Sequence, residues 1–219
     1  MVHLIHSIPL IQMNTRTITL ILVIILVASS CRWKETKDAL KQGDALKASI
    51  ESFEKNRQRL SSSLVTTLED AGDKLSEENP DLPAVSRDFE KDWTSIQSRY
   101  DKLKKDFGEV GENSDAYFAK LDELSSSISD EQLRTEELAK NAELRERWQT
   151  SYQRAEQSLS QVTEVLESGH DFHMVLVASS IRQKLEQNVQ ELDRIAEQAQ
   201  VLLQDLEAFT VAGRELVQG

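Results

Sequence analysis

The sequence contains few of the residues that make turns or covalent cross-links. Its 219 residues include only 7 glycines and 3 prolines. A β-sandwich, a barrel or a doubly wound α/β enzyme needs many more turns, so these folds are excluded. Cys31 is the only cysteine, which excludes an intramolecular disulfide and a cysteine-based zinc site.

Positive charge is also scarce. The 26 lysines and arginines are outnumbered by 38 aspartates and glutamates, giving a net charge of −12. Nucleic-acid binding depends on clustered cations that release counterions from the phosphates, so no nucleic-acid partner is expected. The same acidity gives no attraction to anionic lipid, and a membrane attachment would need another source.

The N-terminal segment has the pattern of a signal peptide. Residues 20–28 form an uninterrupted apolar run, LILVIILVA, which is shorter than the ~20 residues of a membrane-spanning helix. We therefore interpret residues 1–30 as a signal peptide, with translation expected to begin at Met13 because Arg16 then gives a short cationic start. The alternatives are an uncleaved, slightly short membrane anchor and a buried helix.

The end of the apolar run carries the candidate lipid-attachment site. The small residues at 28–30 directly precede Cys31, and this arrangement resembles the lipobox of bacterial lipoproteins. The resemblance implies cleavage before Cys31 and attachment of acyl chains such as palmitate, several of which together give a stable anchor. Position 32 is not the aspartate that retains many lipoproteins at the inner membrane. The resemblance thus implies an outer-membrane protein facing the periplasm if the host is Gram-negative.

Residues 31–33 would form the lipid-attachment point and a short tether. Basic and aromatic side chains collect at the interface between lipid and water, and three such residues follow the cysteine. The candidate membrane-interface residues are Arg32, Trp33 and Lys34.

The rest of the chain, 34–219, shows helical periodicity, with apolar residues three and four positions apart. The clearest stripe consists of Val85, Phe89, Trp93, Ile96, Tyr100, Leu103, Phe107 and Val110. Similar stripes are Leu46, Ile50, Phe53, Leu60, Leu64, Leu68, Ala71 and Leu75, with Arg57 at one position; Tyr117, Leu121, Leu124 and Ile128; Leu144, Trp148, Tyr152, Ala155, Leu159, Val162 and Leu166; and Ile181, Leu185, Val189, Leu192, Ala196, Ala199, Leu203, Leu206 and Phe209. This pattern predicts an all-α fold.

Residues that stop or cap helices divide this region into about four helices. The prolines in 79–83 give the firmest break, and 108–114 gives a softer one. Ser129 fits a capping box with Gln132, and Gly169 suits a left-handed C-terminal cap. The expected helices are near 34–77, 83–128, 130–168 and 171–217. Short connections favour antiparallel neighbours, so we predict a long antiparallel bundle or intramolecular coiled coil. A parallel dimer or other homo-oligomer is the alternative.

From Tyr100 to Leu216 the layout resembles an uncharacterised family of helical lipoproteins in Gram-negative bacteria. The resemblance rests on the spacing of Arg147-Trp148 and Tyr152, of Val165-Leu166, and of the apolar stretch 174–177. Because that family has no established activity, the resemblance implies a fold and a location only.

The residues offer little catalytic chemistry. No phosphate-binding glycine-rich loop, His-Glu-x-x-His or Gly-x-Ser-x-Gly is present in the sequence. Glu167 and His170 have the spacing found on di-iron helices, and His173 lies nearby, but the second Glu-x-x-His that such a site needs is missing. We therefore expect neither a metal nor another cofactor, with His170 near a helix C-terminus, where a cation is favoured.

These observations favour a non-enzymatic protein anchored by lipid in the cell envelope. It would act as a helical spacer, scaffold or adaptor for an envelope protein partner. The alternative is a binding module that holds a lipid or other apolar ligand within or at the end of the bundle. An enzyme is the third hypothesis, and it would require a cleft that brings together Glu167, His170 and His173.

Overall fold

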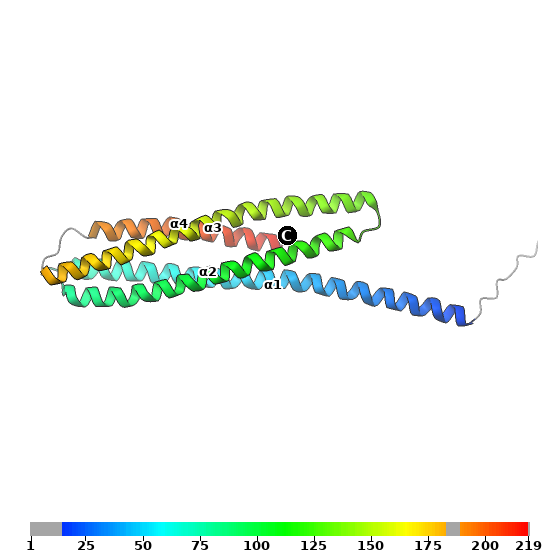
Figure 1. Ribbon diagram of the computed structural model, residues 1–219, viewed down its shortest axis with the longest axis horizontal. Helices are drawn as coiled ribbons and strands as arrows, with labels where there is room; N and C mark the ends of the chain where they lie inside the picture. The colour runs from blue at the N-terminus through cyan, green and yellow to red at the C-terminus, as the bar shows by residue number, and fades with distance from the viewer. Residues whose placement is uncertain (1–14, 183–188, 219) are drawn as a thin grey trace, which may run out of the picture. The chain divides into compact units, whose positions relative to one another are not determined.

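The computed structural model describes the backbone of residues 15–182 and 189–218 and the side chains of 37–182 and 190–218. This part of the chain is almost entirely helical and contains no strand. Figure 1 shows its four helices, α1 (Thr15–Leu75), α2 (Leu82–Ser126), α3 (Glu131–Arg182) and α4 (Val189–Gln218). The prediction of an all-α bundle of about four helices is confirmed.

The chain divides into two units, Met1–Lys41 and Gln42–Gly219. The described part of the first unit belongs to α1, whose helix continues without a break past Cys31. Across the described residues, no helix has a stretch long and apolar enough to cross a membrane. The second unit contains the rest of α1 and the other three helices, and it forms the bundle.

Within the second unit each helix packs against its two neighbours in an antiparallel manner. Lys74 pairs with Asp88 close to the α1–α2 turn, whereas Asn56 bonds Asp106 further from it. Helices α2 and α3 run side by side in opposite directions (Figure 1) and are joined by a short connection after Ser126. Helix α4 returns along α3 and also contacts α1, since Thr210 donates a hydrogen bond to Glu54 at 3.0 Å. Each helix therefore has two neighbours, and α4 packs against both α3 and α1.

The periodic apolar stripes make the core, as the sequence predicts. Every predicted stripe residue from Leu46 to Leu75 is buried, and so is every one from Val85 to Val110. Regular burial at steps of three and four keeps one face of each helix against the others. Since α3 has 52 residues, it is roughly 78 Å long at 1.5 Å per residue.

Aromatic rings from all four helices meet in the middle of the core. Phe209 of α4 lies at the centre, with ring centroids of four other aromatic residues 5.1–5.9 Å away. Those four residues are Phe53, Phe107, Trp148 and Tyr152. Tilted and edge-on pairs at these separations add to the free energy of burial, so this cluster fixes how the helices are aligned.

Polar groups inside the bundle are paired between helices. The indole Nε1 of Trp93 donates to the Leu166 carbonyl at 3.0 Å, and the Tyr100 hydroxyl donates to the Leu159 carbonyl at 2.8 Å. Asn56 donates to the buried Asp106 carboxylate. Each of these hydrogen bonds forms in only one register of the two helices, so the bonded groups specify how the helices are aligned.

The predicted helix end at Gly169 is wrong. Helix α3 continues through this position to Arg182, so the last helix does not begin at residue 171 as expected. Gly169 is instead required for close packing, because a Cβ there would lie 1.8 Å from Cζ2 of Trp93. A glycine can mark either a helix cap or a close approach between helices, and the second applies here.

The expected break at 108–114 is also absent, since α2 runs through it. The helical phase therefore continues from Val110, and the buried positions are Ser114, Phe118 and Ser125. The predicted stripe Tyr117, Leu121, Leu124 and Ile128 is one residue out of phase and is only half-buried.

Two further local predictions are corrected. Asp130, not Ser129, caps α3, because its carboxylate accepts a hydrogen bond from the Leu133 amide at 2.8 Å. Ile181 belongs to the exposed end of α3 and is not a core residue of the last helix, since 77% of its surface is exposed. The predicted core residues Leu185 and Val189 have side chains outside the described residues.

Candidate functional site

A groove lies between α1 and α4 on the surface of the bundle. It has a volume of about 680 Å³ and extends from Arg57 of α1 to Ser76, just after the end of that helix, and along α4 from Leu192 to Glu207. At 1.5 Å per residue these two stretches are roughly 28 and 22 Å long. The groove therefore follows the helix axes for several turns.

The floor of the groove is apolar. Leu64, Leu68 and Leu203 are buried beneath it, whereas Val65 is 50% exposed at its edge. Gly72, Ala196 and Ala199 also line it. All three are small residues; Gly72 and Ala196 are half-buried and Ala199 is buried.

The edges of the groove carry negative charge. Four exposed acidic residues line it on both helices, and they are Glu69, Asp73, Asp193 and Glu207. Arg57 is the one lysine or arginine among the described residues that line it. The groove thus combines an apolar floor with an acidic rim.

Arg57 closes one end of the groove and already has its own partners. Its Nε lies 2.8 Å from Glu54 Oε2, its Nη1 donates to the Leu203 carbonyl at 3.2 Å, and its Nη2 lies 3.5 Å from Glu207. Burial favours a higher pKa for the Glu54 carboxyl, but hydrogen bonds from Arg57 and Thr210 outweigh it and lower the pKa below the ordinary value. The hydrogen bond with Glu54 raises the pKa of Arg57 in turn. Glu54 and Arg57 both belong to α1, and together they reach α4 through Thr210, the Leu203 carbonyl and Glu207.

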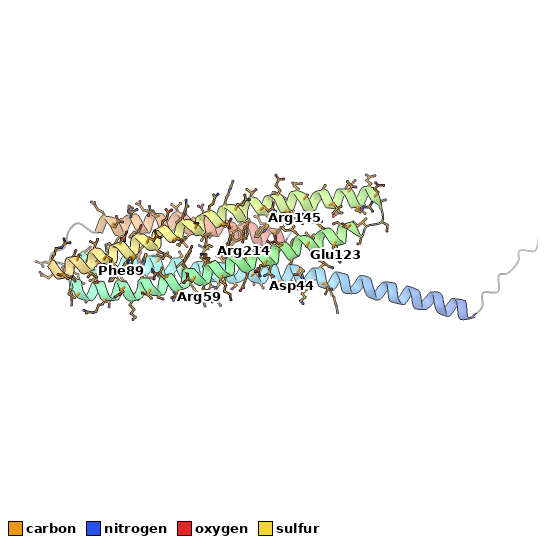
Figure 2. All side chains as sticks on the ribbon, viewed as in Figure 1. Asp44, Arg59, Phe89, Glu123, Arg145 and Arg214 are labelled. Carbon is orange, nitrogen blue, oxygen red and sulfur yellow. The ribbon has the colours of Figure 1, made fainter. Side chains whose placement is uncertain are left out.

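A second recess lies between α2 and α3, with a volume of about 550 Å³. Phe118, Trp148 and Tyr152 line it together with Arg145, whose guanidinium carbon lies 5.0 Å from the centre of the Phe118 ring. Burial raises the pKa of the Tyr152 phenol, and the carboxylates of Glu156 and Asp115 raise it further. Figure 2 shows that Arg145 lies on the same part of the bundle as Glu123, toward the α2–α3 connection.

The candidate lipid-attachment residue Cys31 and the candidate interface residues Arg32, Trp33 and Lys34 all belong to α1. Their side chains lie outside the described residues, so their attachment to lipid and their contact with a membrane stay predictions.

The structure separates the three residues considered for metal binding. Glu167 and His170 are exposed at the α2–α3 groove that also contains Tyr100 and Asp101. His173 points elsewhere, with its Nε2 4.0 Å from Glu90 Oε2. Throughout the described side chains, no group of three or more histidine, cysteine or acidic residues is placed to hold a metal ion. Glu167, His170 and His173 therefore do not form one cleft.

Sequence reasoning missed the groove between α1 and α4. Its two walls are more than a hundred residues apart in the chain, and their alignment depends on contacts such as that between Glu54 and Thr210. The available signal was local: the exposed Val65 beside the core stripe, and the small residues Gly72, Ala196 and Ala199 at core positions.

The fold and the groove define a class, an all-α four-helix bundle with an acidic, apolar-floored surface groove. Comparison with known proteins adds no relative to this description. No protein-family model matches the chain, and neither the curated proteins nor the solved structures contain a significant match to it.

Proposed function

We propose that this protein is a non-enzymatic, lipid-anchored component of the bacterial cell envelope that acts as a scaffold or adaptor for a protein partner. The observation that carries the proposal is the groove between α1 and α4. Exposed apolar surface rimmed by polar groups is characteristic of interaction sites. Here Val65 and Ala196 supply apolar surface beside the carboxylates of Glu69 and Asp193.

The anchor is proposed from the sequence. An apolar run too short to span a bilayer, followed by small residues and a unique cysteine, supports cleavage before Cys31 and its acylation. A chain with net charge −12 has no electrostatic attraction to anionic lipid, so the acyl chains would hold it at the membrane. The outer membrane facing the periplasm is the proposed location in a Gram-negative host.

The bundle itself supports a scaffold. Its core is filled by interlocking apolar and aromatic side chains, and every described buried side-chain nitrogen or oxygen has a hydrogen-bond partner. A core of this kind is rigid, because any shift of one helix breaks contacts on two sides. A rigid bundle presents its surface residues at fixed spacing to a partner.

The second candidate function is binding of a lipid or another apolar ligand in the same groove. Its volume of about 680 Å³ lies in the range of small-molecule sites, and its floor is apolar. The acidic rim disfavours ligands with a negatively charged head group, so a neutral or cationic ligand would be required.

Photocrosslinking in cells tests the scaffold proposal. A photoreactive amino acid is placed in the full chain at exposed positions on each face, including Val65 and Gln200 at the groove and Lys104 and Gln153 on α2 and α3. A scaffold predicts a discrete envelope-protein adduct from adjacent positions on one face. Absence of a protein adduct at every position, together with lipid in the extracted protein beyond its anchor, would favour the ligand-binding alternative.

A further inference from the structure

We propose that the groove between α1 and α4 binds a basic amphipathic helix of the partner protein. This inference rests on the proposed adaptor function and names the chemistry of the partner. The apolar stripe of the partner helix would cover the groove floor. Lysine or arginine residues of the same helix would flank that stripe on both sides. Docking of an amphipathic helix into an apolar groove is a recurring mode of recognition.

The dimensions of the groove suit a helix. A stretch of roughly 22 to 28 Å along α1 and α4 accommodates about 15 to 18 helical residues. Neighbouring helices pack with their axes 8–10 Å apart, and small residues favour the close end of this range. Gly72, Ala196 and Ala199 supply such residues in the groove, and a docked helix there would bury Val65.

The charge of the rim selects the partner. Glu69 and Asp73 stand on α1, and Asp193 and Glu207 stand on α4. These carboxylates lie along both sides of the apolar floor, so the complementary helix has cations on both flanks of its apolar stripe. Arg57 neutralises only the end of the rim at Glu207 and also binds Glu54, so Glu69, Asp73 and Asp193 carry the remaining negative charge.

The same charges disfavour other occupants. A second copy of this chain would bring a net charge of −12 against an acidic rim, and like charges across an interface oppose association. Anionic lipid head groups and fatty-acid carboxylates meet the same repulsion. An acidic or neutral helix would fill the floor but leave the rim without partners.

A peptide titration tests the inference. The probe is a fluorescent 18-residue helical peptide with a leucine and alanine stripe flanked on both sides by lysines; a second peptide has the same stripe flanked by glutamates. Each is titrated by fluorescence anisotropy against the full chain in nanodiscs of neutral phosphatidylcholine, and empty nanodiscs give the background. The lysine peptide is expected to bind, and the glutamate peptide is not.

Matched variants locate the site. Glu69→Gln, Asp73→Asn and Asp193→Asn together should weaken binding of the lysine peptide about tenfold, since each of the three exposed ion pairs contributes a factor of about two. The control combines Asp101→Asn, Glu143→Gln and Glu146→Gln on α2 and α3, which changes the net charge equally and should leave binding unchanged. Because all six residues are exposed, neither triple variant should unfold, and circular dichroism verifies this.

Each other outcome contradicts the inference in a recognisable way. Equal weakening in both triple variants would mean that general acidity, not the groove, attracts the peptide. Equal binding of the glutamate peptide would mean that charge does not select the partner. If crosslinks in cells arise on another face and none at Val65 or Gln200, the groove inference fails while the adaptor function stands. If no face gives a crosslink, the adaptor function itself fails.

Discussion

The indole of Trp93 on α2 lies directly against the backbone of Gly169 on α3. A Cβ at Gly169 would stand 1.8 Å from Cζ2 and 2.1 Å from Cε2 of the ring. The ring is also held by its hydrogen bond to the Leu166 carbonyl at 3.0 Å and by stacking on Phe89, whose centroid is 5.2 Å away. The two helices therefore approach closely only because residue 169 has no side chain.

Gly169→Ala should destabilise the bundle by about 3 kcal/mol. The rigid indole cannot yield by rotating one terminal atom, so the helices must separate or Trp93 must leave its site. Overpacking alone costs about 1–3 kcal/mol, and loss of the indole hydrogen bond adds about 1 kcal/mol. Urea unfolding followed by circular dichroism measures the change. In a chain that already carries Trp93→Leu, Gly169→Ala should change the free energy of unfolding very little.

Gly108→Ala is the matched control and should stabilise the bundle, whereas Gly169→Ala destabilises it. A Cβ at this exposed position of α2 meets no atom within 4 Å. Alanine in a helix interior is more stable than glycine by about 0.5–1 kcal/mol, so the variant should unfold at higher urea concentration than the wild type. Destabilisation by Gly108→Ala would show that α2 is not a continuous helix at this point.

Phe209→Ala should cost about 4 kcal/mol, because it removes a buried ring that contacts aromatic residues on the other three helices. Its closest ring is that of Trp148, with the centroids 5.1 Å apart. Val211→Ala, on the same helix but 45% exposed, should change the free energy of unfolding by less than about 0.5 kcal/mol. Equal effects of the two substitutions would contradict the packing of α4 described here.

The link between Arg57 and Glu54 predicts a pH-dependent stability. The folded-state pKa of Glu54 lies below its ordinary value of 4.5. Its contribution is therefore fully present above pH 4.5 and is lost as the pH falls through the folded-state pKa. In Arg57→Met the guanidinium no longer lowers the pKa of Glu54, so this pKa should rise and the stabilisation that Glu54 contributes above pH 4.5 should shrink.

Urea unfolding of the two proteins at pH 3, 5 and 7 measures this effect. At pH 3 the free energy of unfolding of Arg57→Met should be only slightly lower than that of the wild type. At pH 7 the difference should reach about 2 kcal/mol. Arg59→Met removes an exposed arginine of the same helix (Figure 2). Its difference from the wild type in the free energy of unfolding should not increase with pH. A difference in the free energy of unfolding that does not change with pH would mean that Arg57 stabilises the bundle by packing and not by charge.

The core of the bundle was predictable because it depends on local periodicity. Residues Leu46 to Leu75 and Val85 to Val110 repeat every three to four positions, and both stripes are buried as expected. The prolines near Pro80 likewise define the α1–α2 turn, because proline cannot continue a helix. These features need no knowledge of which helices are neighbours.

Features that depend on neighbouring helices were not predictable. Gly169 looks like a helix cap until Trp93 is known to lie beside it. The acidic groove requires that α1 and α4 be adjacent and in register, and no local pattern fixes that relationship. The surroundings of Glu167 and His173 likewise depend on the neighbouring helices, since these residues are close in sequence yet face different surroundings.

We propose that Cys31 carries the lipid that holds the protein in the envelope. Metabolic labelling with an alkyne fatty acid, followed by fractionation of the bacterial envelope, tests it in wild type, Cys31→Ala and the control Ser30→Ala. We predict labelled, membrane-bound protein in the wild type and in Ser30→Ala, and loss of both label and membrane retention in Cys31→Ala. Wild-type protein that is unlabelled yet stays in the membrane would contradict the account and indicate an uncleaved helical anchor.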